Sequence, residues 1–434
     1  MYRFREYDNI GIKLKRIIVQ KFGGTSVADT EKIKNVAKTV IKEKNNGNDV
    51  VVVVSAMGHT TDYLVKMAKD ISKVPSEREM DMLLSTGEGV SIALLAMAIQ
   101  AEGHEAVSFN AIQAGIYTEN VHSKARILKI ETEKIKKNLN EGKIVVIAGF
   151  QGVTDDCEIT TLGRGGSDTS AVALAAALNA ERCDIYTDVE GVYTTDPRVV
   201  PKASKLKEIS YEEMLELAHA GANVLHPRSV ETAKLNHVPL RVRSTFKTDD
   251  KGTLILGVEK MEIDRPVTGV AADLSQTRVV VCNVPDIPGQ AAKIFSKLAK
   301  DNISVDMIIQ SYARKVSNTN DIAFTIDSVD TDKTIATLNN LKTDLNCGEI
   351  LIDKEIAKVS IVGAGMIDRP GIASTMFETL AKLGINIRMI STSEIKISCL
   401  VNKEDADKAV KALHEEFDLS CDVTAEVKGD LPNV

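Results

Sequence analysis

The first half of the chain begins with an apolar run followed by a glycine-rich turn, Ile17-Ile18-Val19-Gln20-Lys21-Phe22-Gly23-Gly24-Thr25-Ser26. Residues 17–20 have the pattern of a strand that is buried on both faces. The glycines that follow let the backbone approach a phosphate closely, and successive N–H groups there can bind an anion, with Lys21 adding a positive charge. A purely structural turn is the alternative. The segment is not a Walker A loop, because G-x-x-x-x-G-K-[ST] occurs nowhere in the chain.

The same strand pattern recurs further along the chain, with helical patterns between the strands. The strands are expected at Val50 to Val54, Ile144 to Ala148 and Cys183 to Thr187. Helices are expected at Glu31 to Asn45 and Tyr211 to Ala220. Apolar strands that alternate with helices predict an α/β domain whose mainly parallel sheet is covered on both faces. We place this domain at residues 17–258.

The second half of the chain contains an internal repeat. Asp286-x-Pro288-Gly289-x-Ala291 recurs 82 residues later as Asp368-x-Pro370-Gly371-x-Ala373, and matches continue beyond it. This period is too long for a solenoid unit, so the pattern predicts a duplicated small domain in which each copy is strand, turn, amphipathic helix and strand. N–H groups at the start of such a helix can bind a carboxylate. The alternative is that Pro-Gly only shapes a tight turn.

Composition excludes several classes of protein. The chain has 434 residues, a formal charge of −7, 4% aromatic residues and no Trp, which argues against a nucleic-acid binder. The longest apolar stretches, Val50 to Met57 and Ala171 to Leu178, are shorter than the ~18–20 residues of a membrane span, so no membrane partner is expected. The six Cys form no C-x-x-C pair, as expected of reduced thiols in the cytoplasm. Residues 1–16 read as an N-terminal extension without a secretory signal.

A second glycine-rich loop, Thr161-Leu162-Gly163-Arg164-Gly165-Gly166-Ser167-Asp168, precedes a helical run from Ala171 to Ala180. An arginine among glycines beside a helix N-terminus is suited to hold a carboxylate with two hydrogen bonds. The structural alternative is that Ser167 and Asp168 cap the helix, but that alternative does not explain Arg164.

A third loop, residues 187–198, follows another strand, and loops at the carboxyl ends of parallel strands carry ligand sites. Tyr193 offers a face for a base and Arg198 a charge for phosphate. Ser55 to Gly58 and Gly87-Glu88-Gly89, which we expect to interrupt a helix, are weaker candidates for the same cleft. The seven His show no metal-like spacing, and no calcium-loop pattern is present, so no protein metal site is predicted.

Taken together, K-F-G-G-T-S-V, T-L-G-R-G-G-S-D and T-D-V-E-G-V-Y-T-T-D-P-R, followed by a duplicated D-x-P-G module, closely resemble the aspartate kinase family from Ile17 onward. The resemblance is to the monofunctional, amino-acid-regulated type. It implies the amino-acid-kinase fold, a three-layer αβα sandwich with a mainly parallel sheet. Two ferredoxin-like α+β ACT domains would follow, at residues 266–345 and 350–434. In this family the two ACT units are interleaved, so the linear boundary between them is approximate.

The resemblance also implies roles for individual residues. The nucleotide phosphates would meet Lys21, Gly23, Gly24 and Ser26. The aspartate site would comprise Thr25, Ser55, Thr61, Glu88, Arg164, Gly165, Ser167 and Asp168. The adenosine and phosphates would meet Thr187, Asp188, Tyr193 and Arg198. An amino-acid effector would be held by Asp286, Gly289, Gln290, Ala291 and Gln310, with Asn386 and Ile387 at the facing positions of the second ACT unit.

One position departs from the family pattern. Some relatives have a phosphate-facing Lys where this chain has Asn223. Either Lys21 and Mg²⁺ suffice, or another cation such as Lys205 substitutes. Lys21, Arg164 and Asp168 are the expected catalytic residues.

The implied reaction is ATP-dependent phosphorylation of the β-carboxylate of L-aspartate, the first step of lysine, threonine and methionine biosynthesis. A carboxyl group with a pKa near 3.9 is already ionised at neutral pH, so the attack needs no general base. Mg²⁺ would arrive with ATP. Feedback inhibition by lysine, threonine or both, and a homo-oligomer formed through the ACT domains, are also implied.

Two other functions stay open at this point. Another carboxylate or carbamate kinase, such as one that uses acetylglutamate, would share the fold, although the regulatory repeat disfavours it. A non-catalytic amino-acid sensor that kept the kinase fold is the second, disfavoured because Lys21, Arg164 and Asp168 are intact. A nicotinamide enzyme is disfavoured because no G-x-G-x-x-G lies between a strand and a helix.

Overall fold

The structure is a computed structural model that describes residues 16–222, 224–257, 265–311, 318–367 and 369–420. The described chain forms two compact units. The first contains residues up to 192, 205–218 and 224–257, and the second contains 193–204, 219–222 and 265–420. The predicted N-terminal extension lies almost wholly outside the described residues.

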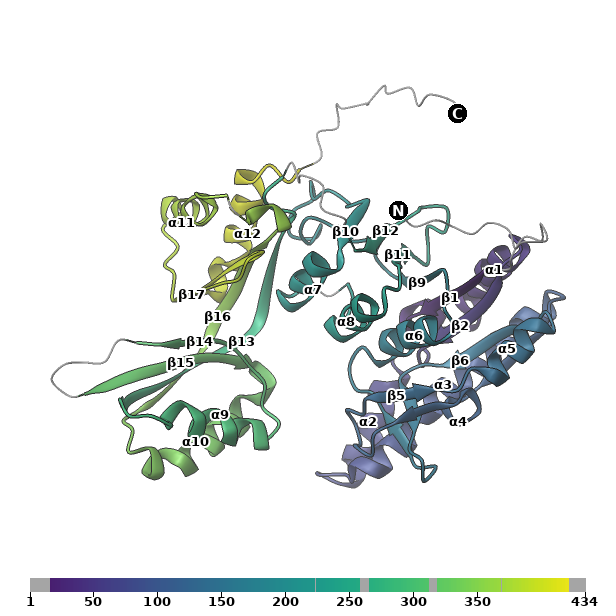
Figure 1. Ribbon diagram of the computed structural model, residues 1–434, viewed down its shortest axis with the longest axis horizontal. Helices are drawn as coiled ribbons and strands as arrows, with labels where there is room; N and C mark the ends of the chain where they lie inside the picture. The colour runs from purple at the N-terminus through teal and green to yellow at the C-terminus, as the bar shows by residue number, and fades with distance from the viewer. Residues whose placement is uncertain (1–15, 223, 258–264, 312–317, 368, 421–434) are drawn as a thin grey trace, which may run out of the picture. The chain divides into compact units, whose positions relative to one another are not determined.

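The first unit is built on an eight-stranded sheet of order β10-β12-β11-β9-β1-β2-β6-β3 (Figure 1). Its strands are β1 (Ile17–Phe22), β2 (Asp49–Val54), β3 (Ala106–Phe109), β6 (Ile144–Ala148), β9 (Arg182–Thr187), β10 (Glu208–Ser210), β11 (Leu240–Ser244) and β12 (Thr253–Leu256). All neighbouring pairs are parallel except β11 with β12. The prediction of a mainly parallel sheet is confirmed.

Helices cover both faces of this sheet. They are α1 (Thr30–Asn45), α2 (Thr60–Ile71), α3 (Glu77–Ala101), α4 (Ala111–Ala114), α5 (Glu133–Asn140), α6 (Gly166–Ala177), α7 (Tyr211–His219) and α8 (Pro227–Asn236). Phe22 packs with α1 and α3 in one hydrophobic core. Because side chains alternate along a strand, Lys21 points to the opposite face, where α6 lies against β1, β2 and β9. Adjacent residues of β1 therefore serve a core and a polar site.

A smaller sheet of order β5-β4-β7-β8 completes the first unit. Its strands are β4 (Ile116–Thr118), β5 (Ile127–Ile130), β7 (Gln151–Val153) and β8 (Ile159–Thr161). The β7–β8 hairpin carries the chain from the end of β6 to the loop that precedes α6. The second predicted glycine loop thus starts from a paired strand.

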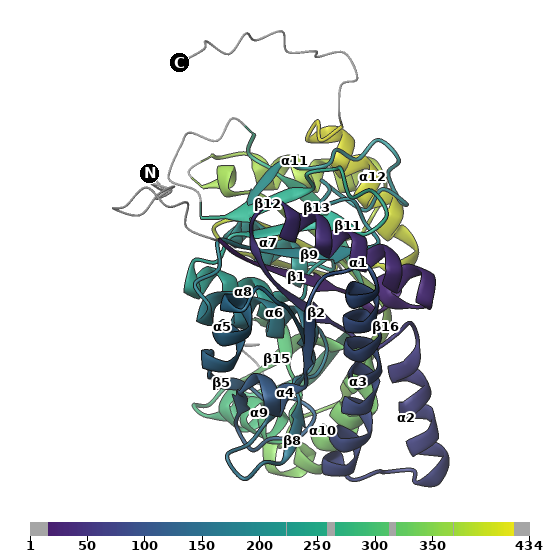
Figure 2. The ribbon, with the colours of Figure 1, turned by 90° about the vertical axis from the view of Figure 1, so that its right-hand side faces the viewer.

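The helix α3, the long helix beside α2 in Figure 2, corrects one prediction. We expected Gly87-Glu88-Gly89 to interrupt a helix, but the helix continues through them. A Cβ at Gly87 would lie 2.9 Å from the Cβ of Ala56, so the missing side chain allows close packing against the loop after β2. Among the described helices, α3 is the only one that is long and apolar enough to cross a membrane. Its residues Ile92, Leu95 and Ile99 pack in the hydrophobic core of the first unit.

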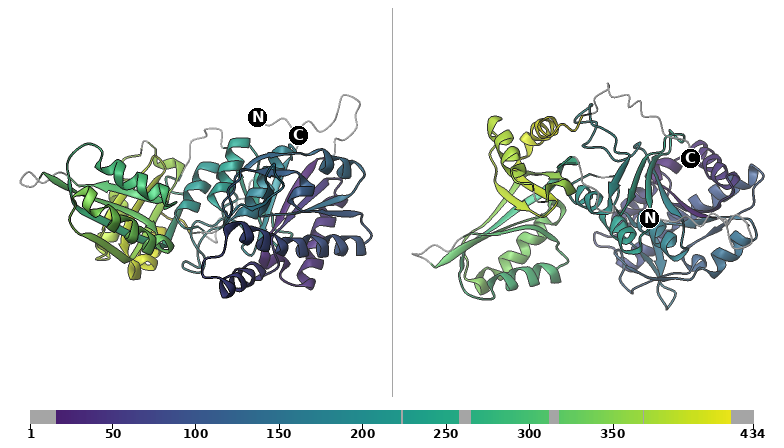
Figure 3. Two further views of the ribbon diagram at one scale, coloured as in Figure 1. Left: turned by 90° about the horizontal axis from the view of Figure 1, so that it is seen from below. Right: turned by 45° about the horizontal axis from the view of Figure 1, so that its top comes forward.

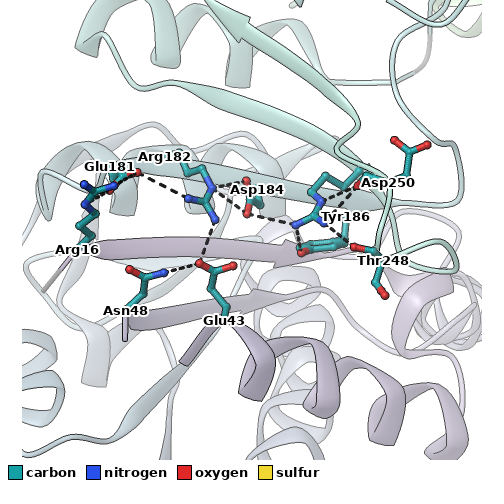
Figure 4. A network of polar contacts seen from close by, with 10 residues as sticks. Arg16, Glu43, Asn48, Glu181, Arg182, Asp184, Tyr186, Thr248 and Asp250 are labelled. Atoms are coloured by element: carbon teal, nitrogen blue, oxygen red, sulfur yellow. Dashed lines mark hydrogen bonds and ion pairs between the residues drawn. The ribbon is translucent and has the colours of Figure 1, made fainter. Parts of the chain in front are cut away.

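A polar network joins β9 to its neighbours on the α1 side (Figure 4). Arg182 Nε donates to Asp184 Oδ1 at 3.0 Å, and Arg182 Nη2 donates to Glu43 Oε1 of α1 at 3.1 Å. Arg243 of β11 donates to the Tyr186 hydroxyl at 2.9 Å. Asp184 is fully buried, which raises the pKa of its carboxyl group, while Arg182 opposes that shift. The network therefore fixes α1, β9 and β11 to one another.

The second unit has one six-stranded antiparallel sheet of order β14-β15-β13-β16-β18-β17 (Figure 3). Its strands are β13 (Gly269–Pro285), β14 (Val305–Gln310), β15 (Thr319–Asp327), β16 (Ile350–Val362), β17 (Met389–Thr392) and β18 (Lys396–Asn402). Its helices are α9 (Gln290–Lys300), α10 (Thr331–Leu345), α11 (Ile372–Lys382) and α12 (Ala406–Glu416). Each repeat is strand, turn, helix and strand, which confirms the predicted elements.

The two repeats have separate hydrophobic cores that share the long strands β13 and β16. One core draws only on residues between Val279 and Ile352 and includes α9 and α10. The other contains α11, α12 and the later part of β16, but also Val267 and Val270 from the start of the repeat region. The first repeat is thus inserted between an early segment of the second repeat and the rest of it.

Candidate functional site

Several predicted site residues meet at the carboxyl edge of the large sheet. The parallel strands β1, β2, β6 and β9 end at Phe22, Val54, Ala148 and Thr187, so the loops after them lie at the same edge. From β1 the chain continues to β2 on one side and later returns to β9 on the other side. A change of direction of this kind leaves a crevice between the loops where ligands bind in open α/β sheets.

Lys21 and Asp168 form an ion pair at this edge. Lys21 Nζ lies 2.7 Å from Asp168 Oδ1, and the two side chains are only 12% and 13% exposed. Asp168 lies in the first turn of α6, where the helix dipole favours a negative charge. The capping alternative is wrong: the N-cap is Gly165, at φ 65°, and it makes no side-chain capping bond. Asp168 is therefore held by Lys21 and not by the helix end alone.

Ser55 and Ser167 join the loop after β2 to the same helix. Ser55 Oγ donates to Ser167 Oγ at 2.9 Å. The loop after β6 approaches closely, because a Cβ at Gly149 would lie 2.8 Å from Ser167 Oγ. Two hydroxyl groups thus meet where the loops after β2 and β6 approach the first turn of α6.

Glu88 reaches this region from the interior of α3. The Ala56 N–H donates to Glu88 Oε1 at 3.1 Å, while Glu88 Oε2 is buried with no hydrogen-bond partner among the described residues. Only 2% of the residue is exposed, and this burial raises the pKa of its carboxyl group to about 7. A buried oxygen without a donor is suited to accept a hydrogen bond from a ligand.

The glycine turn after β1 packs tightly against the loop after β2. A Cβ at Gly24 would lie 2.9 Å from the Ala56 carbonyl oxygen, and one at Gly23 would lie 3.4 Å from Lys21 Nζ. The Ser26 hydroxyl lies 2.6 Å from that of Thr245, which follows β11. Sequence reasoning missed Thr245, because the strand that it follows was not among those predicted. Thr25 is exposed and Thr61 lies in the first turn of α2.

Arg164 extends from the loop before α6. Its side chain is exposed and pairs with none of the residues that the structure describes. The neighbouring Gly165 is tightly packed, since a Cβ there would lie 2.2 Å from the Cβ of His226. The loop backbone is held firmly while the guanidinium group remains available to a ligand.

The third predicted loop divides between the two units. Thr187 ends β9 in the first unit and donates to Asp188 Oδ1 at 3.0 Å. Tyr193 and Arg198 belong to the second unit, where Arg198 Nη2 donates to Asp196 Oδ2 at 2.7 Å and lowers the pKa of that carboxyl group. These two residues therefore belong to a different compact unit from Lys21.

The candidate replacements for the missing phosphate-facing Lys can be located in part. Lys205 forms an ion pair with Asp250. Asn223 lies outside the described residues.

The predicted effector residues line a separate pocket in the second unit. It encloses about 350 Å³ and is lined by Asp286, Gly289, Gln290, Ala291 and Gln310, together with Asn320, which sequence reasoning missed. Asn320 Nδ2 donates to Asp286 Oδ1 at 3.1 Å. Gln290 Oε1 and Asn320 Oδ1 are buried with no partner among the described residues. The pocket thus offers several acceptors beside the N-terminus of α9.

The facing positions of the second repeat do not line this pocket. Asn386 is exposed, and Ile387 packs against the core of the second repeat, in the segment before β17. The equivalent acidic residue, Asp368, lies outside the described residues.

Comparison with known proteins identifies the relatives of this chain. The amino acid kinase family matches residues 16–244, and ACT domains match residues 279–341 and 359–417. An aspartokinase of Bacillus sp. (strain MGA3) is 58% identical over 93% of this chain and 98% of its own length. Aspartokinase 2 of Bacillus subtilis (strain 168) is 55% identical over the same shares.

Solved structures show the same similarity. E. coli aspartokinase III in complex with aspartate and ADP, in its R-state, aligns with a TM-score of 0.79 at 30% identity, over 92% of this chain and 99% of that one. The T-state complex of that enzyme with lysine and aspartate gives 0.72 at 29% identity over the same shares. The two-unit architecture, the loops at the sheet edge and these matches show that the chain belongs to the aspartokinases, enzymes with an amino acid kinase domain and ACT domains.

Proposed function

We propose that this chain transfers the γ-phosphoryl group of ATP to the β-carboxylate of L-aspartate. The observation that supports it most is the Lys21–Asp168 pair at 2.7 Å. The Ser55–Ser167 hydrogen bond at 2.9 Å joins the loop after β2 to the same helix, α6, at the carboxyl edge of the sheet. A related enzyme at 30% identity has been solved with aspartate and ADP bound. The proposal includes the role of this reaction as the first step in lysine, threonine and methionine biosynthesis.

The main obstacle in this reaction is the repulsion between two anions, because both substrates are negatively charged. Lys21 and the amides of Gly23 and Gly24 would neutralise the phosphates and stabilise the transferred group, with Ser26 beside them. Arg164 would bind the α-carboxylate and leave the β-carboxylate free to align. No residue need act as a general base, since the acceptor is already ionised.

Asp168 and Glu88 would hold the substrate ammonium group. An ammonium is a three-fold donor, and Glu88 Oε2 is a buried acceptor that lacks one. The hydroxyl groups of Thr25, Ser55, Thr61 and Ser167 and the backbone of Gly165 would complete the aspartate site. Thr187, Asp188, Tyr193 and Arg198 would contact the nucleotide.

Mg²⁺ would enter with ATP and add charge neutralisation at the phosphates. The described residues contain no group of three His, Cys, Asp or Glu that could hold a metal ion. We therefore propose that phosphates provide most of its ligands, with at most one or two carboxylates.

The test is an assay of the purified chain with ATP and L-aspartate, in which hydroxylamine traps the acyl phosphate. A panel of acetylglutamate, glutamate and carbamate runs in parallel. Turnover with aspartate and not with the panel supports the proposal, whereas a preference for another acceptor would assign a different carboxylate or carbamate kinase. No turnover with any acceptor, in protein that still binds an amino acid, would favour the sensor function.

We further propose that an amino acid, lysine or threonine or both, binds the pocket of Asp286, Gln290, Gln310 and Asn320 and inhibits the enzyme. The buried acceptors suit an ammonium group, and the N-terminus of α9 suits a carboxylate. A related enzyme has been solved with lysine bound. Titration of each amino acid into the assay tests this, and Asp286→Asn should weaken the inhibition; inhibition that is equal in both proteins would remove the pocket from the proposal.

The domain limits and the surroundings of the chain belong to the same proposal. We assign the kinase domain to residues 17–258, apart from 193–204 and 219–222, which belong to the second compact unit. We assign the ACT units to 266–345 and 350–434, with Val267 and Val270 completing the core of the second ACT unit. The described residues Cys157, Cys183, Cys347 and Cys399 are free thiols, which suits a cytoplasmic enzyme.

A further inference from the structure

Asp81 is a buried carboxylate of α3 to which neither the sequence analysis nor the proposed mechanism gives a role. It is 0% exposed. Its Oδ1 accepts a hydrogen bond from the Thr161 hydroxyl at 2.6 Å, and its Oδ2 lies 2.8 Å from His122 Nδ1. The Ser123 N–H donates to both oxygens, at 3.2 and 3.0 Å. Burying a carboxylate costs desolvation free energy, and these hydrogen bonds compensate for it. Such a residue is expected to have a structural or functional role.

The two segments that Asp81 joins support the loop that carries Arg164. Thr161 ends β8, three residues before Arg164, and its carbonyl oxygen accepts the Ala125 N–H at 2.9 Å. Ser123 has a φ of 67°, a conformation that residues with a Cβ rarely adopt. A Cβ at Gly163 would lie 3.0 Å from the Ser123 carbonyl oxygen. Asp81 therefore holds segment 122–125 in the shape against which Gly163 packs.

Arg228 of α8 fixes the same two segments from another direction. Its Nη1 donates to the Leu162 carbonyl oxygen at 2.9 Å, and its Nη2 donates to that of Ala125 at 2.7 Å. Hydrogen bonds to a charged donor are among the stronger ones in proteins. Asp81 and Arg228 thus both hold the backbone on the N-terminal side of Arg164.

We propose that Asp81 is a positioning residue that sets the direction of Arg164 and thereby the affinity for the acceptor's α-carboxylate. Because no described residue pairs with the Arg164 side chain, its direction depends on the backbone of its loop. A displacement of about 1 Å in such a group can cost two orders of magnitude in rate. The inference rests on the proposed function, since it needs Arg164 to bind the acceptor.

The test is Asp81→Asn, which keeps the size of the side chain. It replaces one carboxylate oxygen by an NH2 group, which cannot accept the hydrogen bonds that Thr161 and Ser123 donate. We expect the KM for aspartate to rise roughly tenfold, as for a partial loss of the Arg164 contact, while kcat and the KM for ATP change less than about twofold. Arg164→Ala should show the same pattern, only larger. An unchanged KM for aspartate in folded Asp81→Asn protein would overturn the proposal.

Two further comparisons separate positioning from general destabilisation. Glu213→Gln is the matched control. This carboxylate is also buried and accepts a hydrogen bond from the Ser210 hydroxyl at 2.7 Å, but it lies in the first turn of α7 and not beside the Arg164 loop. If Asp81→Asn and Glu213→Gln change kcat, the KM for aspartate and the KM for ATP to the same extent, the positioning role is wrong. Should Asp81→Asn fail to fold, Thr161→Val and Thr161→Ser decide: only the valine should raise the KM, because serine keeps the hydroxyl group, and equal values for both would overturn the proposal.

The same assays distinguish this inference from the proposed function. If wild-type protein does not use aspartate, the proposed function fails, and the KM comparison is made with the acceptor that the substrate panel identifies. If wild-type protein uses aspartate and Asp81→Asn does so equally well, only the positioning role fails.

Discussion

Lys21 lies one residue before the end of β1 and forms an ion pair with Asp168 at 2.7 Å. In the proposed reaction the same ammonium group must face the phosphates, so its pairing with Asp168 holds it ready at the sheet edge. The alternation of side chains along β1 explains why a charged residue can occur in a buried strand, since only Phe22 faces the core of α1 and α3.

Replacing Lys21 by alanine should lower kcat by about a hundredfold or more, the scale of losing one preorganised charge. The measurement is steady-state turnover at saturating ATP and aspartate. Lys44→Ala is a matched control, because Lys44 forms a similarly buried pair with Asp49 at 2.9 Å. Near-normal turnover of the Lys21 variant would remove the proposed role.

Glu88 should make the protein less stable as the pH rises. Burial raises the pKa of its carboxyl group from 4.5 to about 7. Between these values the folded state binds a proton that the unfolded state has released, so its contribution to stability is largest below pH 4.5 and is lost as the pH rises to 7. Glu88→Gln should therefore raise the free energy of unfolding by roughly 1–3 kcal/mol at pH 8, and by less at pH 5.

The same substitution should weaken aspartate binding, because the amide of glutamine carries no charge for the ammonium group. Urea denaturation at the two pH values and the KM for aspartate measure the two effects. If the substitution changes the free energy of unfolding by the same amount at pH 8 and at pH 5, ionisation of Glu88 does not destabilise the folded protein.

At the scale of elements, the polar network of β9 joins this strand to α1 and β11. Asp184 is fully buried, and Arg182 is its principal partner. Removing one member of a buried ion pair leaves the other charge uncompensated, which typically costs about 3–5 kcal/mol.

We expect Arg182→Met to lower the free energy of unfolding by about that amount, measured by urea denaturation at pH 7. Because protonation of Asp184 would relieve the penalty, the loss should shrink at acidic pH. The double variant Arg182→Met with Asp184→Asn is the control and should recover part of the stability. Equal stability of wild type and the single variant would contradict the role of the network.

At the scale of the whole molecule, the second unit ends in two edge strands with matching exposed residues. Ile308 of β14 and Ile390 of β17 hold equivalent positions in the repeat and are 50% and 40% exposed. Unpaired strand edges with exposed apolar side chains are prone to pair with another chain. These edges support the proposed homo-oligomer of ACT units.

Ile390→Lys should lower the molar mass of the assembly in light scattering and weaken inhibition by the effector. Val329→Lys is the control, since Val329 is exposed in the second unit but belongs to the turn after β15 and not to an edge strand. Unchanged mass and inhibition in the Ile390 variant would place the contact between subunits elsewhere.

Much of the fold could be predicted because continuous β-branched runs are typical of strands, and in the first half of the chain they mark the buried parallel strands. The repeat was equally accessible, since Asp-x-Pro-Gly and the residues after it recur in register. The continuity of α3 could not be predicted: Gly87 weakens a helix by propensity, and only the nearby Ala56 of another segment explains it. Local patterns cannot report such contacts.

The residues of the candidate site that stand out most in the sequence lie in or beside glycine-rich loops. Lys21, Arg164 and Asp168 stand out because their residue types are unusual beside strands and glycines. Thr245 and Asn320 do not, because each is an ordinary polar residue at the end of or within a strand, and only the fold brings it to its site. Asp81 likewise has no local signature, since its partners lie about 40 and 80 positions away.

The insertion of one ACT repeat within the other imposes an order on synthesis. The inner copy, from Val279 to Ile352, leaves the ribosome complete and can fold at once. The outer copy has already exposed Val267 and Val270 by then, and they must wait for residues near Leu413 before their apolar surface is covered. A nascent chain stalled between these points would present an unfinished hydrophobic surface next to a finished one, which makes that interval the period of greatest need for a chaperone.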